Sequence, residues 1–182
     1  ALRDWFEPES LAASAVLDDS AVIASDFRID AGGHMRFAIF AGAETGPARI
    51  GRILQRLSEV ETYKAMAMLG LPRARDLNAA MARIDGGLSA LLDEMSQETA
   101  APEAALEQLL TLATDLETLM SRAAFRFGAT GAYEAIVNQR VQVLRENRFS
   151  GHQTFAEFMM RRFDPAMRTV KSTERQLRSM TD

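Results

Sequence analysis

Apolar and polar residues alternate over residues 21–41, and this period of two predicts a β-hairpin. Asp30, Ala31, Gly32 and Gly33 separate the two arms, and glycine readily takes the positive φ angles of a tight turn. Residues 11–17 are a candidate third strand. Because an isolated hairpin is only marginally stable in water, we expect it to pack on a helix or to belong to a larger sheet. One face of the first arm consists of Ile23, Ser25, Phe27 and Ile29, and one face of the return strand consists of Met35, Phe37 and Ile39.

After Gly42 the apolar spacing becomes helical. Residues 45–47, Thr-Gly-Pro, are typical of a helix start, and we expect Gly70 and Pro72 to end that helix. Pro102 is expected to begin another helix. The first helix has an apolar stripe of Ile50, Leu54, Leu57 and Met68, and the next has one of Leu77, Ala80, Met81, Ile84, Leu88, Leu91 and Met95.

The segment after Pro102 has apolar residues at alternating steps of three and four, a heptad pattern typical of knobs-into-holes packing. A helix from Pro102 to Glu146 would be about 68 Å long. Gly128 and Gly131 disfavour it by about 1 kcal/mol each, which packing can offset. We expect one long helix, with a break near these glycines as the alternative, and we interpret the glycines as sites of close helix packing. The heptad positions are 106, 109, 113, 116, 120, 123, 127, 130, 134, 137, 141 and 144.

Thr154 and Glu157 match a capping box, so the last helix is expected to begin there, with a kink or interruption at Pro165. The expected fold is mainly α (α+β). Long antiparallel helices would form a bundle or coiled-coil-like assembly, with an N-terminal β-hairpin or small antiparallel sheet. We expect residues 1–44 to form the β segment, as part of a sheet with upstream residues, and residues 45–182 to form an elongated helical domain.

The composition excludes several kinds of site. The chain has 182 residues, of which 47% are hydrophobic, and it contains no cysteine and two histidines. Disulfides, thiolate zinc sites and cysteine nucleophiles are therefore excluded. No P-loop, dinucleotide fingerprint, HExxH or nucleophile elbow is present. We expect no catalytic motif, metal or cofactor, and no membrane span within these residues.

Charge is distributed unevenly around a net value of −4: residues 1–139 carry −8 and residues 140–182 carry +4. The overall acidity makes nucleic acid a poor candidate partner. A basic face is expected on the last helix, either as an ordinary solvated face or as a contact with anionic lipid head groups. Its residues are Arg161, Arg168, Lys171, Arg175 and Arg178.

Four charged residues fall on or near faces that should be apolar: Glu61, Lys64, Glu134 and Arg162. Buried charges are rare unless paired, so these four are a candidate polar cluster inside the bundle. An ion pair with a structural role is one interpretation, and a ligand, partner or catalytic site is the other. Facing carboxylates can hold metals in helical bundles, but such sites use Glu-x-x-His pairs, which this chain lacks. Tyr63 and Tyr133 lie off the stripes and are expected at the helix surface.

Several longer strings resemble one uncharacterised bacterial family of predicted membrane-anchored proteins, domain of unknown function 3422. They are GRILQRLSEVETY at 51–63, LGLP at 69–72 and R-F-x-A-T-x-A-Y at 126–133. DFRI at 26–29, Q-T-x-x-E-F-x-x-R-R at 153–162 and PAMRT at 165–169 fit as well. The chain departs from the family pattern at Gly128 or Gly131, where a larger residue is expected, and at Glu134, where an aromatic is expected.

The resemblance implies an upstream region and a C-terminal pair of membrane spans, neither present in this chain. The chain would then be a soluble middle fragment tethered at the cytoplasmic side of the bacterial inner membrane, in agreement with its basic tail. The family supplies no activity. We therefore interpret the chain as a non-enzymatic helical interaction or scaffold module that binds a protein partner or itself through the heptad helix. The alternative is a small-ligand or metal-dependent enzyme built on the candidate polar cluster.

Overall fold

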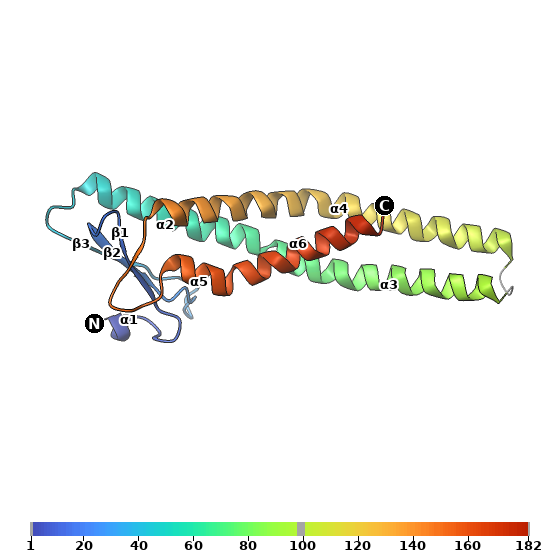
Figure 1. The fold of residues 1–182 in the computed structure, drawn as a ribbon, viewed down its shortest axis with the longest axis horizontal. Coiled ribbons are helices and arrows are strands. Elements are labelled where there is room, and N and C mark those ends of the chain that lie inside the picture. The colour runs from blue at the N-terminus through green and yellow to red at the C-terminus, as the bar shows by residue number, and fades with distance from the viewer. Residues whose placement is uncertain (1, 98–100, 182) are drawn as a thin grey trace. The chain divides into compact units, whose positions relative to one another are not determined.

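The computed structural model describes residues 2–97 and 101–181 and is mainly helical (Figure 1). The helices are α1 (Leu2–Trp5), α2 (Pro47–Met68), α3 (Gly70–Ser96), α4 (Pro102–Val143), α5 (Phe155–Arg162) and α6 (Asp164–Ser179). The strands are β1 (Ala12–Val16), β2 (Ala21–Ser25), β3 (Ala38–Ala41) and β4 (Asn147–Arg148). The expected fold class, long helices with a small antiparallel sheet near the N-terminus, is confirmed.

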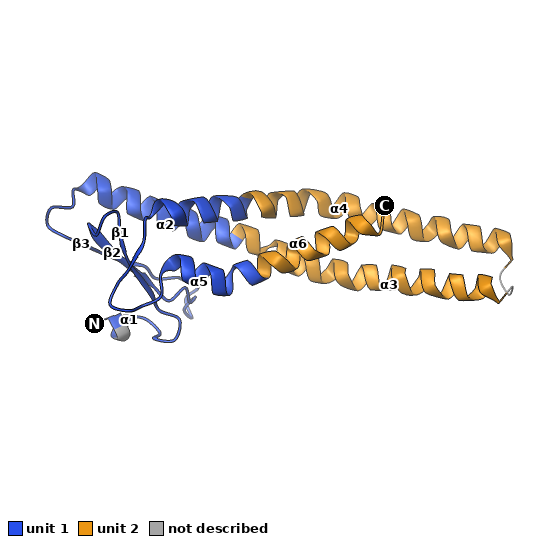
Figure 2. Cartoon of the chain, in the orientation of Figure 1, with its two compact units in different colours: residues 1–65, 133–165 blue, residues 66–132, 166–182 orange. Residues whose placement is uncertain are grey.

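The chain divides into two compact units (Figure 2). Unit 1 comprises residues 1–65 and 133–165, which include the sheet, α5, most of α2 and the end of α4. Unit 2 comprises residues 66–132 and 166–182, which include α3, the first part of α4 and most of α6. A division into domains at residue 44 stays a prediction.

The sheet in unit 1 has the strand order β3-β2-β1-β4, with every neighbouring pair antiparallel. The hairpin and the third strand are therefore confirmed, since β2 pairs with β3 and residues 12–16 form β1. Strand β4 is an addition that the sequence pattern did not predict. Its two residues lie far along the chain and pair with Ser14 and Ala15 of β1.

The first arm of the hairpin is shorter than expected. It ends at Ser25, and Ile29, which was expected on the inner face, is 70% exposed. The cause is local: Ser25 Oγ accepts from the Phe27 amide at 3.0 Å, and Asp26 Oδ1 accepts from the Arg28 amide at 3.1 Å. Side chains that bond the backbone two residues on compete with the strand ladder, and Phe27 takes a positive φ of 53°.

Most predicted helix limits are confirmed. Helix α2 begins at Pro47, and α4 begins at Pro102 and continues to Val143 without a break at the two glycines. The capping box at Thr154 is present, and the interruption falls immediately before Pro165, between α5 and α6. One limit is wrong in part, because Gly70 begins α3 as well as following the end of α2.

The glycines that pack closely are different from those expected. A Cβ atom added at Gly128 or Gly131 would meet no neighbouring atom within 4 Å, so the close-packing interpretation of these residues is wrong. A Cβ atom at Gly70 would lie 2.5 Å from Thr130 Oγ1. Gly70 is therefore one place where α3 and α4 approach closely within unit 2, and Gly87, whose Cβ would lie 3.1 Å from Leu112, is another.

The apolar stripe predicted for α2 coincides with fully buried residues only at Leu57. Leu54, assigned to the stripe, is 55% exposed, while Ile53, Leu57 and Val60 are buried. Continuing the spacing of three and four along this face leads to Lys64. Because a lysine lies in the middle of the buried face, the apolar spacing alone did not show which residues of α2 are buried.

Candidate functional site

The first candidate site lies in unit 1, where α2 places Lys64 against the aromatic side chains near the sheet. The Lys64 side chain is 14% exposed, and its Nζ lies 2.6 Å from Glu61 Oε2. The same Nζ lies 4.8 Å from the centroid of the Phe27 ring, within range of a cation–π interaction. A carboxylate and an aromatic ring thus hold one mostly buried cation.

Phe27 is held by other aromatic rings. Its ring stacks on Phe158 at a centroid distance of 4.2 Å and meets Phe155 edge-on at 4.9 Å. Phe37 lies 5.8 Å away, also edge-on. Because Phe27 lies just after β2 while Phe155 and Phe158 pack from α5, the cluster ties α5 to the sheet, and Lys64 adds α2 to the same cluster.

Of the predicted polar cluster, Glu61 and Lys64 form an ion pair. Glu134 is half-buried on α4. Arg162 is exposed although it follows the buried face of α5, since it is the last residue of that helix and its long stem reaches solvent. A site that uses all four residues stays a prediction.

The two tyrosines were expected at the helix surface, but the structure shows them as a stacked pair. The rings of Tyr63 and Tyr133 are half-buried, with centroids 5.8 Å apart and planes at 26°. Along the same pair of helices, Glu59 of α2 forms an ion pair with Arg140 of α4. A hydrogen bond from Gln55, together with Arg140, lowers the pKa of Glu59. These contacts join α2 and α4 within unit 1.

Glu146 is a half-buried carboxylate that the sequence reasoning missed. It accepts hydrogen bonds from Ser14 Oγ at 2.8 Å, the Phe155 amide at 3.0 Å and the Ala156 amide at 2.9 Å. Burial raises the pKa of Glu146, and these hydrogen bonds oppose the rise in part. The carboxylate joins β1 to the N-terminus of α5. The only sequence signal nearby was the capping box eight residues later.

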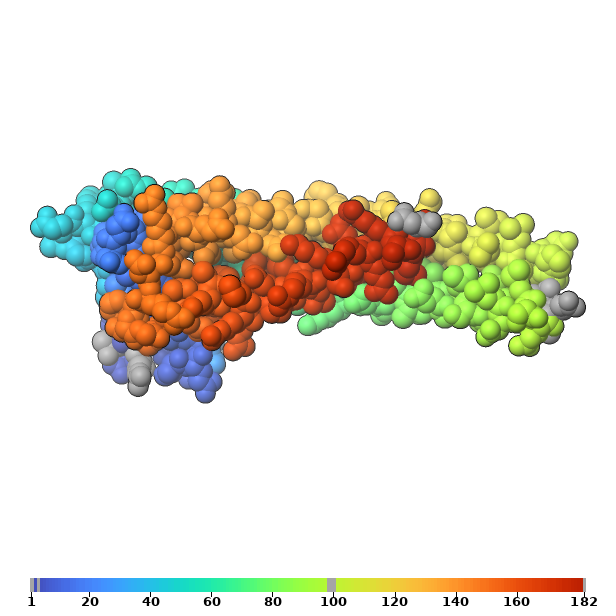
Figure 3. Space-filling view, viewed as in Figure 1, coloured from blue at the N-terminus to red at the C-terminus, as the bar shows by residue number. Residues whose placement is uncertain are grey.

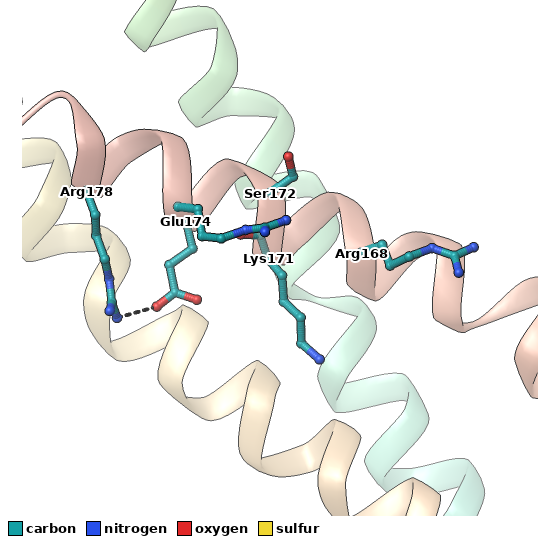
Figure 4. A pocket seen from close by; sticks show the side chains of 6 residues that line it. Arg168, Lys171, Ser172, Glu174 and Arg178 are labelled. Atoms are coloured by element: carbon teal, nitrogen blue, oxygen red, sulfur yellow. Dashed lines mark hydrogen bonds and ion pairs between the residues drawn. The ribbon is translucent and has the colours of Figure 1, made fainter.

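The second candidate site is the basic face of α6 in unit 2 (Figure 4). One side of this helix is buried through Met167, Val170, Thr173 and Leu177. At 100° per residue, the cations project within about an 80° arc on a different side. A shallow groove of about 670 Å³ is lined by Arg168, Lys171, Ser172, Glu174, Arg175 and Arg178. Arg161, the fifth residue of the predicted face, is exposed on α5 and belongs to unit 1.

The third candidate site is an apolar surface on α3 and α4 in unit 2. Six large apolar side chains are at least 38% exposed, and we call them the exposed seam: Leu88, Leu92, Met95, Leu106, Leu109 and Leu110. On the face seen in Figure 3, α6 (red) covers α3 and α4 over only part of their length. An adjoining groove of about 780 Å³ is lined by Leu110, Ala113, Thr114, Leu116, Glu117, Met120, Ser121, Ala124, Met180 and Thr181.

The exposed seam continues faces that are buried elsewhere in the same helices. On α3, Leu88 and Met95 follow the buried residues Leu77 and Ile84 at helical spacing. On α4, the heptad positions 106 and 109 are exposed, whereas 116, 123 and 127 are buried. The apolar pattern is thus continuous, while its coverage by other parts of unit 2 is not.

Comparison with known families gives a match that extends over residues 1–182 and is described as "Protein of unknown function (DUF3422)". The chain belongs to the DUF3422 family. The resemblance stated from the sequence is confirmed at this level. No curated protein and no solved structure matches the chain.

Two further observations concern this DUF3422 chain as far as the structure describes it. None of its described helices combines the length and the apolar character needed to cross a membrane. Over residues 2–97 and 101–181, no three His, Asp or Glu side chains are grouped so that they could hold a metal ion.

Proposed function

We propose that this chain is a helical interaction module and that its exposed seam is the binding surface for a partner helix. The observation that carries the proposal is the exposure of heptad residues that are buried one or two turns further along. Leu109 is 46% exposed and Leu116, one heptad later, is 9% exposed. Contiguous apolar surface of this kind is typical of interaction sites.

The energy available at the exposed seam is sufficient for binding. Fully burying a leucine or methionine is worth about 1.5–3 kcal/mol, so a half-exposed side chain gains roughly 1 kcal/mol when covered. The six residues of the seam therefore offer several kcal/mol. Part of this binding free energy is offset because the partner loses translational, rotational and conformational freedom when it binds.

Site-specific photo-crosslinking in the native host tests the proposal. A photoreactive amino acid replaces Leu109, and the matched control replaces Leu54, an exposed leucine on α2 in unit 1. We expect a discrete crosslinked species from position 109 alone, lost when Leu92 and Leu106 are changed to serine. A crosslinked product of twice the mass of the expressed protein would identify a second copy as the partner. Equal crosslinking from both positions, or none from position 109, would refute the proposal.

A second proposal concerns the basic face of α6, which we infer lies against an anionic membrane surface in a membrane-anchored bacterial protein, on the cytoplasmic side. The grouping of Arg168, Lys171 and Arg175 on one exposed arc supports it, since each cation near such a surface contributes about 1 kcal/mol. Co-sedimentation with phosphatidylglycerol vesicles should fall with Lys171→Glu plus Arg175→Glu. Equal binding of this variant, or equal binding to neutral phosphatidylcholine vesicles, would contradict it.

The alternative of an enzyme built on Glu61, Lys64, Glu134 and Arg162 stays a prediction. The contacts of Lys64, at 2.6 Å from Glu61 Oε2 and over the Phe27 ring, are those of an ion pair that fastens α2 to the aromatic cluster. The exposed seam therefore offers the better supported function.

A further inference from the structure

We propose that the partner of the exposed seam is an amphipathic helix with basic flanks. This inference rests on the proposed function and adds the chemical class of the partner. It follows from the charge around the seam, from the helix that already packs in unit 2, and from the place where that helix ends.

The charges that α3 and α4 carry around the exposed seam are all acidic. Residues 84–121 contain no lysine or arginine. The acidic residues of this stretch that the structure describes are all exposed, and Glu117 lines the groove beside Leu110. An apolar surface bordered by carboxylates alone favours a helix with cations beside its apolar stripe. The acidic residues of the stretch are Asp85, Asp93, Glu94, Glu98, Glu103, Glu107, Asp115 and Glu117.

Helix α6 shows that a basic amphipathic helix can pack in unit 2, next to the exposed seam. It packs its stripe of Met167, Val170 and Leu177 in unit 2, and carries cations on its exposed side. Figure 4 shows α6 lying beside both α3 and α4. The α3–α4 pair thus already holds one basic amphipathic helix over the part of its length where its own apolar residues are buried.

The end of α6 defines where a further helix would begin. Met180 and Thr181, just past the end of α6, line the same groove as Leu110 and Leu116. A helix laid in the groove would therefore continue the row that α6 occupies. A second copy of the seam is a poor occupant, because it would bring one set of carboxylates against another without a compensating base.

Fluorescence titration with synthetic helices tests the inference on the whole chain. The chain has no cysteine, so one dye can be attached at Thr114→Cys, on the groove, and in a separate control at Thr111→Cys, which points away from it at helical spacing. Three 18-residue helices serve as probes. All carry the same leucine stripe, and their flanks are lysine, glutamate or glutamine.

We expect the lysine-flanked helix to bind at least about tenfold more tightly than the other two at low salt, with the difference falling as salt rises. The signal should come from position 114 and not 111, and Leu92→Ser plus Leu109→Ser should weaken it by about tenfold or more. Equal binding of all three helices, abolished by the serine variant, would overturn the basic partner while the proposed function stands. Binding of none of them would overturn both.

Discussion

The contact between Gly70 and Thr130 gives the sharpest test of how α3 packs on α4. An alanine at position 70 would place its Cβ 2.5 Å from Thr130 Oγ1, 3.0 Å from Cγ2 and 3.2 Å from Cβ. Thr130 is 3% exposed, so its side chain has little room to move away. Gly70→Ala must therefore push the start of α3 away from α4 or distort the threonine.

The expected magnitude follows from two opposing effects. Overpacking a tight contact costs about 1–3 kcal/mol. Alanine gains up to about 1 kcal/mol over glycine in a helix. The free energy of unfolding should therefore fall by about 1–2 kcal/mol. Thr130→Ala removes the two atoms nearest to the new methyl group, and Thr130 Oγ1 has no hydrogen-bond partner among the described residues.

A double-mutant cycle in urea, followed by circular dichroism at 222 nm, measures the effect. Thr130→Ala should cost at least about 1 kcal/mol less in the Gly70→Ala variant than in the wild-type chain. Gly128→Ala is the matched control: its Cβ meets no neighbour within 4 Å, so it should stabilise the protein by about 0.5–1 kcal/mol. A Gly70→Ala protein as stable as Gly128→Ala, or a cycle with no coupling, would refute the proposed close contact.

Two other predictions concern the heptad and pH. Leu116→Ala should lower the free energy of unfolding by about 2–3 kcal/mol and Leu109→Ala by less than about 1 kcal/mol, because only the former is buried; similar losses in urea unfolding would contradict the difference. Since the pKa of Glu146 is raised, its stabilisation relative to Glu146→Gln should be present below its ordinary value of 4.5 and be lost as pH rises through the raised pKa. The pKa of Glu59 is lowered, so its stabilisation relative to Glu59→Gln should be present above pH 4.5 and be lost as pH falls. If the two wild-type-minus-variant differences in unfolding free energy changed with pH in the same direction, the assigned pKa shifts would be contradicted.

Local chemistry made several elements predictable from the sequence. The starts of α2 and α4 follow from Pro47 and Pro102, because proline fixes φ and suits the first turn. The start of α5 follows from the capping box at Thr154, in which the residue and its partner are three positions apart. Such signals act within one turn of the chain, so the sequence alone displays them.

The features that escaped prediction depend on residues far apart in sequence. Gly70 has the sequence signal of a helix stop, and only the structure shows its contact with Thr130. In the sequence Glu146 resembles an ordinary surface charge, and only the structure shows its hydrogen bonds with Ser14 and the start of α5. Lys64 interrupts the buried face of α2, and only the Phe27 ring, which lies beyond the early end of β2, explains how the cation is accommodated. Of the residues that contact Lys64, Glu61 is the one that the sequence analysis had placed in the same cluster.

The heptad of α4 shows why hydrophobic spacing alone does not locate a binding surface. Leu109 and Leu116 occupy the same heptad position, so spacing treats them alike, although one is exposed and the other buried. Charge is a second signal, which describes the whole stretch and does not distinguish these two residues. Cations are absent between Arg83 and Arg122, and the exposed seam lies within that stretch. The acidic residues of this stretch that the structure describes are all exposed, like the six apolar residues of the seam. The acidic run therefore marks the surface that a basic partner would cover.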